Sequence, residues 1–465
     1  MAPCIFSLHY ATRFMKTILI LGAGLSSNML VRYFVERADA LKIKIRLGDK
    51  SIATAAAKVE KCAQCTAFEF DVFNDLQRNR EVAKANLVIS MLPARMHPVV
   101  ARTCIRYGVN MVTASYASSE IRELDFEARK KGIVVMNECG LDPGIDHMSA
   151  MQMINRIRDR GLELVAFESS TGGLVAPGFE NNPWQYKFTW NPRNVVLAGK
   201  DGARFLHNGK FKYIPYHKLF SRIETIDVPG LGEFEVYGNR DSLTYRETYR
   251  LHHLETMFRG TIRRPGFCEA WDTFVQLGAT DDSYVMEDTE NMTCRDFINS
   301  FMAYRVDIPV EKKLSLYLGI PEDSAMMGRL KWLGIFDDTK LCVPGLTPAR
   351  VLQSILEKKW SLEADDKDMI VMQHQFDYIE DQKRKKIYST MTFIGKDSYN
   401  TAMAATVGLP VAITSRLILE GRVNLKGVQL PIMKEVYEPV LEELAEYDIR
   451  FVEEEVEIPM DISSL

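Results

Sequence analysis

Two glycines and an acid downstream form the first group of residues in this chain with spacing suited to ligand chemistry. Gly22 and Gly24 follow an apolar run that starts at Thr17, and Asp49 ends the next strand-like segment. The glycines would allow a tight turn and close approach of a phosphate to a helix start, while the acid would reach an adenosine ribose. Ser27 stands where a third glycine would complete the motif, so the pair alone also fits a plain turn.

Polar residues after two later strand-like segments have the types that acid–base chemistry needs. Ser115 and Tyr116 follow a segment ending at Thr113, and Asp142 follows the next one. Parallel sheets bind ligands at the carboxyl ends of their strands, so these side chains are candidates for contacting a substrate. Two alternatives stay open: a Tyr116 hydroxyl satisfied at the sheet edge, and an Asp142 that caps a turn or helix.

Two arginine-bearing loops have the chemistry to hold a substrate with several acids. Arg240 lies in the loop at residues 237–242, and Arg263 lies in the loop at residues 259–266. The planar guanidinium presents a fork of donors that matches a carboxylate. Each arginine considered alone also fits a surface charge or an internal ion pair.

Alternating strand-like and helical segments would position these residues. The strand-like segments are 17–21, 42–49, 67–72, 86–92, 109–113 and 132–137, and helical patterns such as 98–107 and 118–131 lie between them. This alternation predicts an α/β fold with a doubly wound parallel sheet of the Rossmann type. Further along, residues 162–267 read as a mixed, largely antiparallel domain, residues 269–336 as helical, and residues 398–408 and 410–421 as two apolar helices.

The composition indicates a soluble globular protein that acts on small molecules. The chain has 465 residues, of which 46% are hydrophobic and 26% charged, with a net charge of -4. That charge gives no reason to expect nucleic acid or a membrane surface as a partner. No stretch resembles a membrane-spanning helix of about 20 apolar residues, and residues 1–14 lack a signal-peptide pattern, so we expect an extension or an upstream start there.

Cysteines and acidic runs carry no special function in this interpretation. Cys62 and Cys65 are the only closely spaced pair among eight cysteines, and no second ligand pair lies nearby. We therefore predict no metal and free thiols, as in a reducing cytoplasm. The acidic run at residues 453–455 is predicted to be solvated surface.

Several long motifs, in order, resemble the saccharopine reductase family, the glutamate-forming saccharopine dehydrogenases of lysine metabolism. They lie at residues 135–147, 172–177, 182–183, 186–190, 239–241, 259–261 and 331–336, and the resemblance extends over residues 17–431. It implies a variant Rossmann dinucleotide-binding domain, a mixed α/β domain for substrate and dimerisation, and a small helical domain. We assign these to residues 16–142 with 398–432; to 143–268, 343–397 and 433–465; and to 269–342.

The resemblance also implies roles for individual residues. Tyr116 and Asp142 would be catalytic, orienting a secondary amine or relaying its proton, with the division of roles left open. The residues implied to bind saccharopine are Ser115, Tyr116, Asp142, Arg240, Thr261 and Arg263. Those implied to bind the cofactor are Gly22, Gly24, Leu25, Asp49, Lys50, Asp71, Val72, Leu92, Leu141, Asp142 and Pro143.

Some positions depart from the family's pattern. Ala114 and Asn191 replace hydroxyl residues that contact the cofactor in the family. The family favours NADP and carries an arginine after its second strand, where this chain has Lys50 preceded by Asp49. Asp49 should repel a 2′-phosphate while Lys50 or Arg46 offsets the repulsion, so we expect a weaker preference for NADP, leaning to NAD.

The favoured function is reversible condensation of 2-aminoadipate 6-semialdehyde with L-glutamate to saccharopine, with hydride transfer from NADPH or NADH to an imine. The enzyme would act as a cytoplasmic homodimer on small amino-acid substrates. One alternative is a carboxynorspermidine-type reductase of polyamine imines, against which Arg240 and Arg263 argue, because a polyamine is itself cationic. The other is a non-catalytic scaffold that binds the cofactor.

Overall fold

Residues 15–459 are described by the computed structural model, in which the chain divides into two units. Among the described residues, unit 1 comprises residues 15–144 and 407–431, and unit 2 comprises residues 145–406 and 432–459. The extension expected at residues 1–14 lies outside the described residues. Residues 269–342, which the sequence suggests as a helical domain of their own, belong to unit 2.

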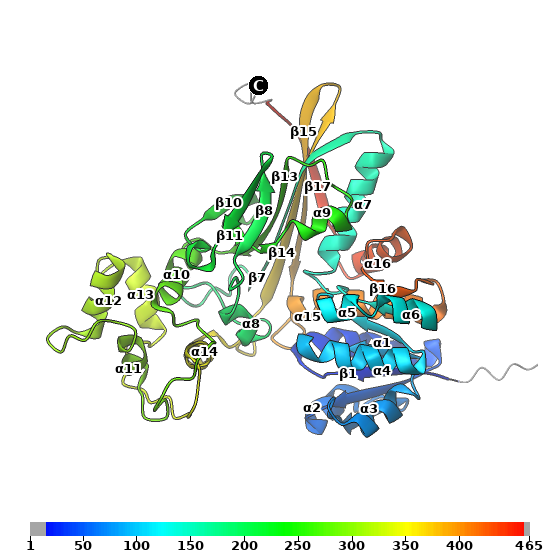
Figure 1. Ribbon diagram of the computed structural model, residues 1–465, viewed down its shortest axis with the longest axis horizontal. Helices are drawn as coiled ribbons and strands as arrows, with labels where there is room; N and C mark the ends of the chain where they lie inside the picture. Colours follow the sequence, from blue (N-terminus) through cyan, green and yellow to red (C-terminus); the bar gives the residue numbers. More distant parts are fainter. Residues whose placement is uncertain (1–14, 460–465) are drawn as a thin grey trace, which may run out of the picture. The chain divides into compact units, whose positions relative to one another are not determined.

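Unit 1, which contains β1 and β16 in Figure 1, is built on a parallel sheet of seven strands. The strand order is β16-β6-β5-β4-β1-β2-β3. The strands are β1 (Lys16–Leu21), β2 (Ile43–Asp49), β3 (Cys65–Glu69), β4 (Leu87–Ser90), β5 (Asn110–Thr113), β6 (Val134–Met136) and β16 (Gly427–Gln429). The order reverses at β1 and β4, as in doubly wound dinucleotide-binding folds. The predicted fold class is confirmed, and β16 adds a strand that the sequence did not indicate.

Helices pack on the strands of unit 1 through alternating apolar side chains. They are η1 (Leu25–Ser27), α1 (Asn28–Leu41), α2 (Ile52–Val59), α3 (Asp75–Val82), η2 (Ala94–Met96), α4 (His97–Tyr107), α5 (Ser119–Arg122) and α6 (Asp125–Lys131). Leu19 and Leu21 join a hydrophobic cluster with Val100 and Cys104 of α4. Ile18 and Ile20 are also buried but alternate to the other face of β1, as the period of two requires. Both faces of this sheet are therefore covered.

Unit 2 is built on a mixed sheet of ten strands. Seven follow the order β10-β11-β13-β7-β14-β15-β17, and β8 pairs with β9, β12 and β13 beside them. The strands are β7 (Glu163–Val175), β8 (Ala203–His207), β9 (Lys210–Ile214), β10 (Ile223–Val228), β11 (Gly232–Gly238), β12 (Arg240–Asp241), β13 (Thr256–Arg263), β14 (Asp368–Glu380), β15 (Lys383–Ile394) and β17 (Val452–Ile458). Only β13 with β7 and β12 with β8 are parallel pairs in this described sheet, so the mixed, largely antiparallel prediction is confirmed.

The helices of unit 2 lie before and between its strands in the sequence, and several of them contribute to its hydrophobic core. They are α7 (Ile145–Asp159), α8 (Pro192–Val196), η3 (Tyr216–Lys218), α9 (Thr244–Thr248), α10 (Phe267–Leu277), α11 (Cys294–Asn299), α12 (Val310–Leu318), α13 (Ala325–Trp332), α14 (Pro348–Trp360) and α16 (Lys434–Glu446). Trp184, Trp271 and Trp360 are each at most 1% exposed and lie in one cluster with Val236 and Ile262 of the sheet. This cluster joins the helical segment to the sheet.

The two apolar helices predicted around residue 409 are one helix, α15 (Ala402–Glu420), with Pro410 inside it. The chain passes from unit 2 to unit 1 within α15. Proline costs an interior hydrogen bond, about 3 kcal/mol, but Val411 and Ile413 beside it are fully buried, and their packing outweighs that cost. Within the described residues, α15 also has the length and hydropathy of a membrane span, and 83% of that stretch is buried inside the protein, as in a core helix.

The prediction that the acidic run at residues 453–455 is solvated surface is confirmed, because all three glutamates are exposed on β17, an edge strand, where Glu455 also pairs with Lys385 at 3.5 Å. The prediction of free thiols at Cys62 and Cys65 is wrong. Cys62 and Cys65 are joined by a disulfide instead of being free thiols. The turn between α2 and β3 brings their Cα atoms to 5.2 Å, within the range that a disulfide spans.

Candidate active site

The turn after β1 has the geometry of a phosphate-binding loop. Gly22 has a φ of +102°, and a Cβ there would lie 2.7 Å from the Met91 carbonyl oxygen, so only glycine fits. A Cβ on Gly24 would meet no atom within 4 Å, which leaves open space beside the turn. η1 and α1 begin directly afterwards, and their first N–H groups favour an anion. These residues fit the pyrophosphate of a dinucleotide.

Asp49 fixes this turn to the end of β2. Its carboxylate accepts hydrogen bonds from the Ala23 N–H at 2.7 Å and from the Ser51 N–H at 2.9 Å. Lys50, the next residue, is exposed. Of the two cations expected to offset the charge of Asp49, Lys50 or Arg46, the second pairs with buried Glu81.

Arg46 lies 2.6 Å from Glu81, whose side chain is 2% exposed. A buried carboxylate needs such a partner, which commits the guanidinium to the interior. The other residues implied to bind the cofactor follow the carboxyl ends of strands. Asp71 and Val72 come after β3 and Leu92 after β4, while Leu25 is 59% exposed at the start of η1. All lie at the edge where doubly wound sheets bind nucleotides.

Tyr116 and Asp142, the predicted catalytic pair, lie together in unit 1. The Tyr116 hydroxyl donates to the Asp142 carboxylate at 3.3 Å. Asp142 precedes Pro143 in a tight loop, closed by the Gly140 N–H donating to the Pro143 carbonyl at 2.9 Å. A phenol and a carboxylate in contact can share and pass a proton.

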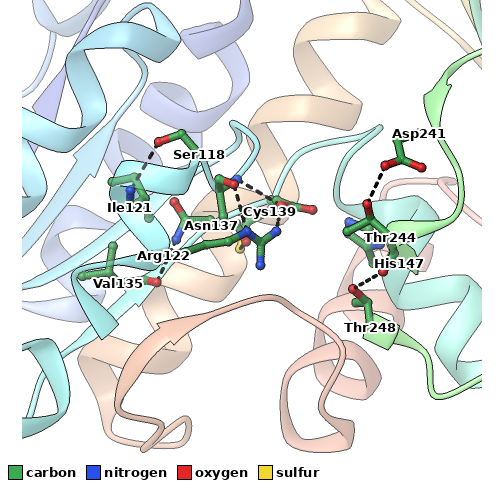
Figure 2. A network of polar contacts seen from close by, with 12 residues as sticks. Ser118, Ile121, Arg122, Val135, Asn137, Cys139, His147, Asp241, Thr244 and Thr248 are labelled. Atoms are coloured by element: carbon green, nitrogen blue, oxygen red, sulfur yellow. Dashed lines mark hydrogen bonds and ion pairs between the residues drawn. The ribbon is translucent and has the colours of Figure 1, made fainter. Parts of the chain in front are cut away.

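Glu138, which sequence reasoning missed, holds the two loops in register. Its carboxylate accepts from the Ala117 N–H at 3.0 Å and lies 3.7 Å from Arg122, and its own N–H donates to the Ser115 carbonyl at 3.0 Å. Glu138 is 2% exposed. Figure 2 shows the Arg122 side chain beside this segment and the Asn137 side chain, which donates to the Val135 carbonyl at 3.0 Å. The only sequence signal for Glu138 was its position just after a buried strand. Acidic residues in that position usually face solvent, so the signal did not single it out.

A buried histidine, which sequence reasoning also missed, orients the Ser115 hydroxyl. His97 at the start of α4 lies with Nε2 2.8 Å from the Ser115 hydroxyl and with Nδ1 2.9 Å from the Ser90 hydroxyl. Burial lowers the pKa of His97 to about 4, so the ring is neutral near pH 7. A neutral imidazole donates through one nitrogen and accepts through the other, so one of the two hydroxyls accepts from the ring and the other donates to it.

The two departures from the family's pattern have structural roles here. A Cβ on Gly140 would lie 3.0 Å from the Ala114 methyl group, so a larger residue at 114 would crowd the loop that carries Asp142. Asn191 caps α8, its side chain accepting from the Arg193 N–H at 2.9 Å. Both positions are therefore used for packing and capping in this chain.

Arg263, in unit 2, is a buried cation among aromatic rings. It is 5% exposed, and its guanidinium carbon lies 5.2 to 5.7 Å from the ring centres of Tyr186, Tyr237 and Phe267. It donates to its neighbour's carbonyl, that of Ile262, at 2.9 Å, while its Nε has no hydrogen-bond partner. Such rings attract a cation but do not neutralise it.

Neutral phenols leave the charge of Arg263 uncompensated. Burial raises the pKa of Tyr186 to about 12 and also raises the pKa of Tyr237. No carboxylate of the described residues forms an ion pair with Arg263, whereas Arg259 on the same strand pairs with buried Asp146 at 2.8 Å. An unpaired buried guanidinium is costly, so this position fits an anionic ligand.

The remaining predicted substrate residues also belong to unit 2. Thr261 is two residues before Arg263 on β13, so both side chains share one face of the strand, and Tyr237 of β11 lies opposite Thr261. Arg240 in β12 has a φ of +54° and lines a cavity of about 220 Å³ with Asn194, Leu197, Gly199, Lys200 and Asp201. Within residues 15–459, no three His, Cys, Asp or Glu side chains are grouped as metal ligands.

Comparison with known proteins gives family matches over both parts of the chain. The family described as "Saccharopine dehydrogenase NADP binding domain" matches residues 18–136, and "Saccharopine dehydrogenase C-terminal domain" matches residues 140–449. A Saccharomyces cerevisiae protein named saccharopine dehydrogenase [NADP(+), L-glutamate-forming] is 32% identical over 92% of this chain and 96% of its own length. A rat alpha-aminoadipic semialdehyde synthase is 33% identical over 94% of this chain and 47% of its own length.

A solved structure agrees with these matches. The apo saccharopine dehydrogenase (L-Glu forming) from Saccharomyces cerevisiae superposes with a TM-score of 0.85 at 30% sequence identity, covering 95% of this chain and all of that one. The likeness therefore includes both the nucleotide-type sheet and the mixed sheet.

Proposed function

The chain belongs to the saccharopine dehydrogenase family, and we propose that it interconverts saccharopine with 2-aminoadipate 6-semialdehyde and L-glutamate, with NADP as cofactor. In the oxidative direction the C–N bond of the secondary amine becomes a C=N bond, and water then splits the imine into aldehyde and glutamate. Bound NADP supplies the hydride acceptor, and NADPH the donor in the reverse direction.

The observation that carries the substrate assignment is the unpaired charge of Arg263. Saccharopine has three carboxylates, and one of them would supply the anion that the aromatic surroundings of Arg263 lack. Arg240 and Thr261 would bind further polar groups of the same substrate. A polyamine would bring a second positive charge to Arg263, which disfavours the carboxynorspermidine-type alternative.

Tyr116 and Asp142 would handle the proton of the reacting amine. The ammonium form of the amine must lose one proton before the neutral amine can give up hydride and become the protonated imine, and the carboxylate of Asp142 is an acceptor held 3.3 Å from the Tyr116 hydroxyl. Ser115, oriented through His97, would hold a polar group of the substrate beside them. Gly22, Gly24 and Asp49 would hold the cofactor at the other end of the same sheet edge.

Three further features are proposed from the sequence and the family resemblance. The protein would form a homodimer, which light scattering after gel filtration can check. Its location would be cytoplasmic, and it would use NAD less well than NADP but more readily than its relatives do. Nothing in the fold favours a role as a non-catalytic scaffold.

Steady-state kinetics with purified protein test the proposed function. Saccharopine and carboxynorspermidine are each offered with NADP and with NAD, and absorbance at 340 nm is followed. We expect turnover of saccharopine with NADP to exceed the other three combinations. Faster turnover of carboxynorspermidine would favour the polyamine reductase alternative over the proposed substrate. Cofactor binding without any turnover would favour the non-catalytic scaffold.

A further inference from the structure

Lys58 of α2 lies against the glycine turn and has only neutral partners. Its ammonium donates to the Gly24 carbonyl at 2.7 Å and to the Ser27 hydroxyl at 3.0 Å, and it also contacts the Asn28 side-chain oxygen. No carboxylate of residues 15–459 forms an ion pair with it. A cation in this position is partly desolvated, and Asp49 acts on its charge only from beyond ion-pair distance.

The position of Lys58 is on the adenosine side of the turn. α2 follows directly after β2, whose last residue, Asp49, is where a dinucleotide fold meets the ribose. Asp49 would repel a phosphate on the ribose 2′-oxygen. Arg46 pairs with Glu81, so Lys58 is the partly buried cation that remains beside the turn among the described residues.

We propose that Lys58 binds the 2′-phosphate of NADP and gives the enzyme its preference for NADP over NAD. The proposal rests on the proposed function only in taking this turn as the dinucleotide site. Ser27, in place of the third glycine, and Asn28 hold the ammonium beside Gly24 until the cofactor enters. The ammonium then exchanges neutral oxygens for phosphate oxygens, which bind it more strongly.

A pH dependence follows from the burial of this lysine. Burial lowers the pKa of Lys58 to about 8, and Asp49, the charged group that acts on it, opposes the shift. The bound phosphate favours the protonated ammonium, so affinity for NADPH should fall as pH rises above about 8. Arginine keeps its charge in this range, so a Lys58→Arg variant should lose that dependence.

Direct binding measurements test the proposal without substrate. Dissociation constants for NADPH and NADH are measured through the fluorescence of the bound nicotinamide between pH 6.5 and 9.5, and for 2′,5′-ADP by calorimetry. The variants are Lys58→Gln, Lys58→Arg and, as a matched control, Lys61→Gln, an exposed lysine just past α2. Circular dichroism confirms that each variant is folded.

We expect Lys58→Gln to weaken NADPH and 2′,5′-ADP roughly tenfold or more and NADH less than threefold, with Lys61→Gln unchanged. Lys58→Arg should keep NADPH binding and flatten its pH dependence. Equal weakening of NADPH and NADH would mean that Lys58 only supports the turn, and unchanged NADPH binding would remove it from the site; either result overturns the proposal. A wild-type protein that binds neither cofactor would instead overturn the proposed function.

Discussion

At the scale of single residues, the site is marked by charges that the fold does not satisfy. Arg259 and Arg263 lie on one strand and are about equally buried, but Arg259 has Asp146, while Arg263 has aromatic rings, one carbonyl and the neutral Tyr237 hydroxyl. Structural arginines are paired when buried, so an unpaired one indicates a ligand. The sequence placed both in the same basic loop and could not separate them, because the partner of Arg259 lies 113 positions away in the chain.

Removing the charge of Arg263 should separate stability from activity. In an Arg263→Met variant we expect equal or higher thermal stability, since an uncompensated buried charge is replaced by an apolar chain of similar length. Its kcat/KM for saccharopine should fall by an amount that corresponds to roughly 2 to 4 kcal/mol of lost transition-state stabilisation. Its affinity for NADPH should not change. Arg264→Ala is the matched control, because Arg264 already pairs with Glu180 at 2.9 Å. Wild-type kinetics in folded Arg263→Met would remove Arg263 from the substrate site.

Tyr116 and Asp142 should act as one unit in the chemical step. Tyr116→Phe and Asp142→Asn are each expected to lower kcat roughly 10²- to 10⁴-fold while NADPH still binds. Because the two side chains are in contact, the double variant should lose much less than the product of the single effects. Fully multiplicative losses in a double-mutant cycle would show that the two act independently.

At the scale of elements, the end of β2 shows how one carboxylate can serve the fold and the cofactor. The sequence identified Asp49 as a ribose-binding acid from its spacing, but not that it also ties the glycine turn to α2. That second role depends on backbone N–H groups from two separate loops, which no side-chain pattern records.

Two substitutions at Asp49 should therefore differ. Asp49→Asn keeps one oxygen to accept from Ala23 while removing the charge, so kcat/KM should shift towards NADP relative to NAD. Asp49→Ala also loosens the turn and should weaken both cofactors. Parallel titrations with NADPH and NADH distinguish the two effects. An unchanged NADP-to-NAD ratio in Asp49→Asn would show that the charge does not reach the ribose.

The sequence did not predict α15 and β16 correctly, because contacts between residues far apart in the chain determine both elements. Pro410 predicted a break, yet α15 continues through it, and its start is capped by Asp368 from β14, which accepts from the Met403 N–H at 2.9 Å. β16 has only three residues and exists because it pairs with β6. The other six strands of unit 1 could be predicted because apolar runs and turns are local signals.

At the scale of the whole molecule, the two units carry different buried titratable groups. Burial lowers the pKa of His374 in unit 2 to about 4, but raises the pKa of Glu168 to about 7 and of Asp368 to about 6. Unit 1 has the buried His97, whose pKa is also lowered to about 4. Within unit 2, His374 and the pair Glu168 and Asp368 therefore have opposite effects on stability as the pH changes.

Unit 2 should become more stable on mild acidification. A histidine that is buried in its neutral form lowers the free energy of unfolding as pH falls below about 6.5, the pKa of histidine in the unfolded chain. A carboxyl whose pKa is raised in the folded protein has the opposite effect, because it increases the free energy of unfolding as pH falls through the raised pKa. Between pH 7 and 5 two carboxyls oppose one histidine, so the urea midpoint of unit 2 should rise. All five tryptophans lie in unit 2, so intrinsic fluorescence follows it. Glu168→Gln should flatten or reverse the trend, and a wild-type midpoint that falls would contradict this account.

The central claim, that this protein is a glutamate-forming saccharopine dehydrogenase, is tested most directly by identifying its products. Purified protein is incubated with saccharopine and NADP, and mass spectrometry quantifies glutamate, 2-aminoadipate 6-semialdehyde and NADPH together. The account predicts one glutamate and one semialdehyde for each NADPH formed, with all three lost in Asp142→Asn. NADPH formation without glutamate, or no reaction of saccharopine in protein that binds NADPH, would contradict it.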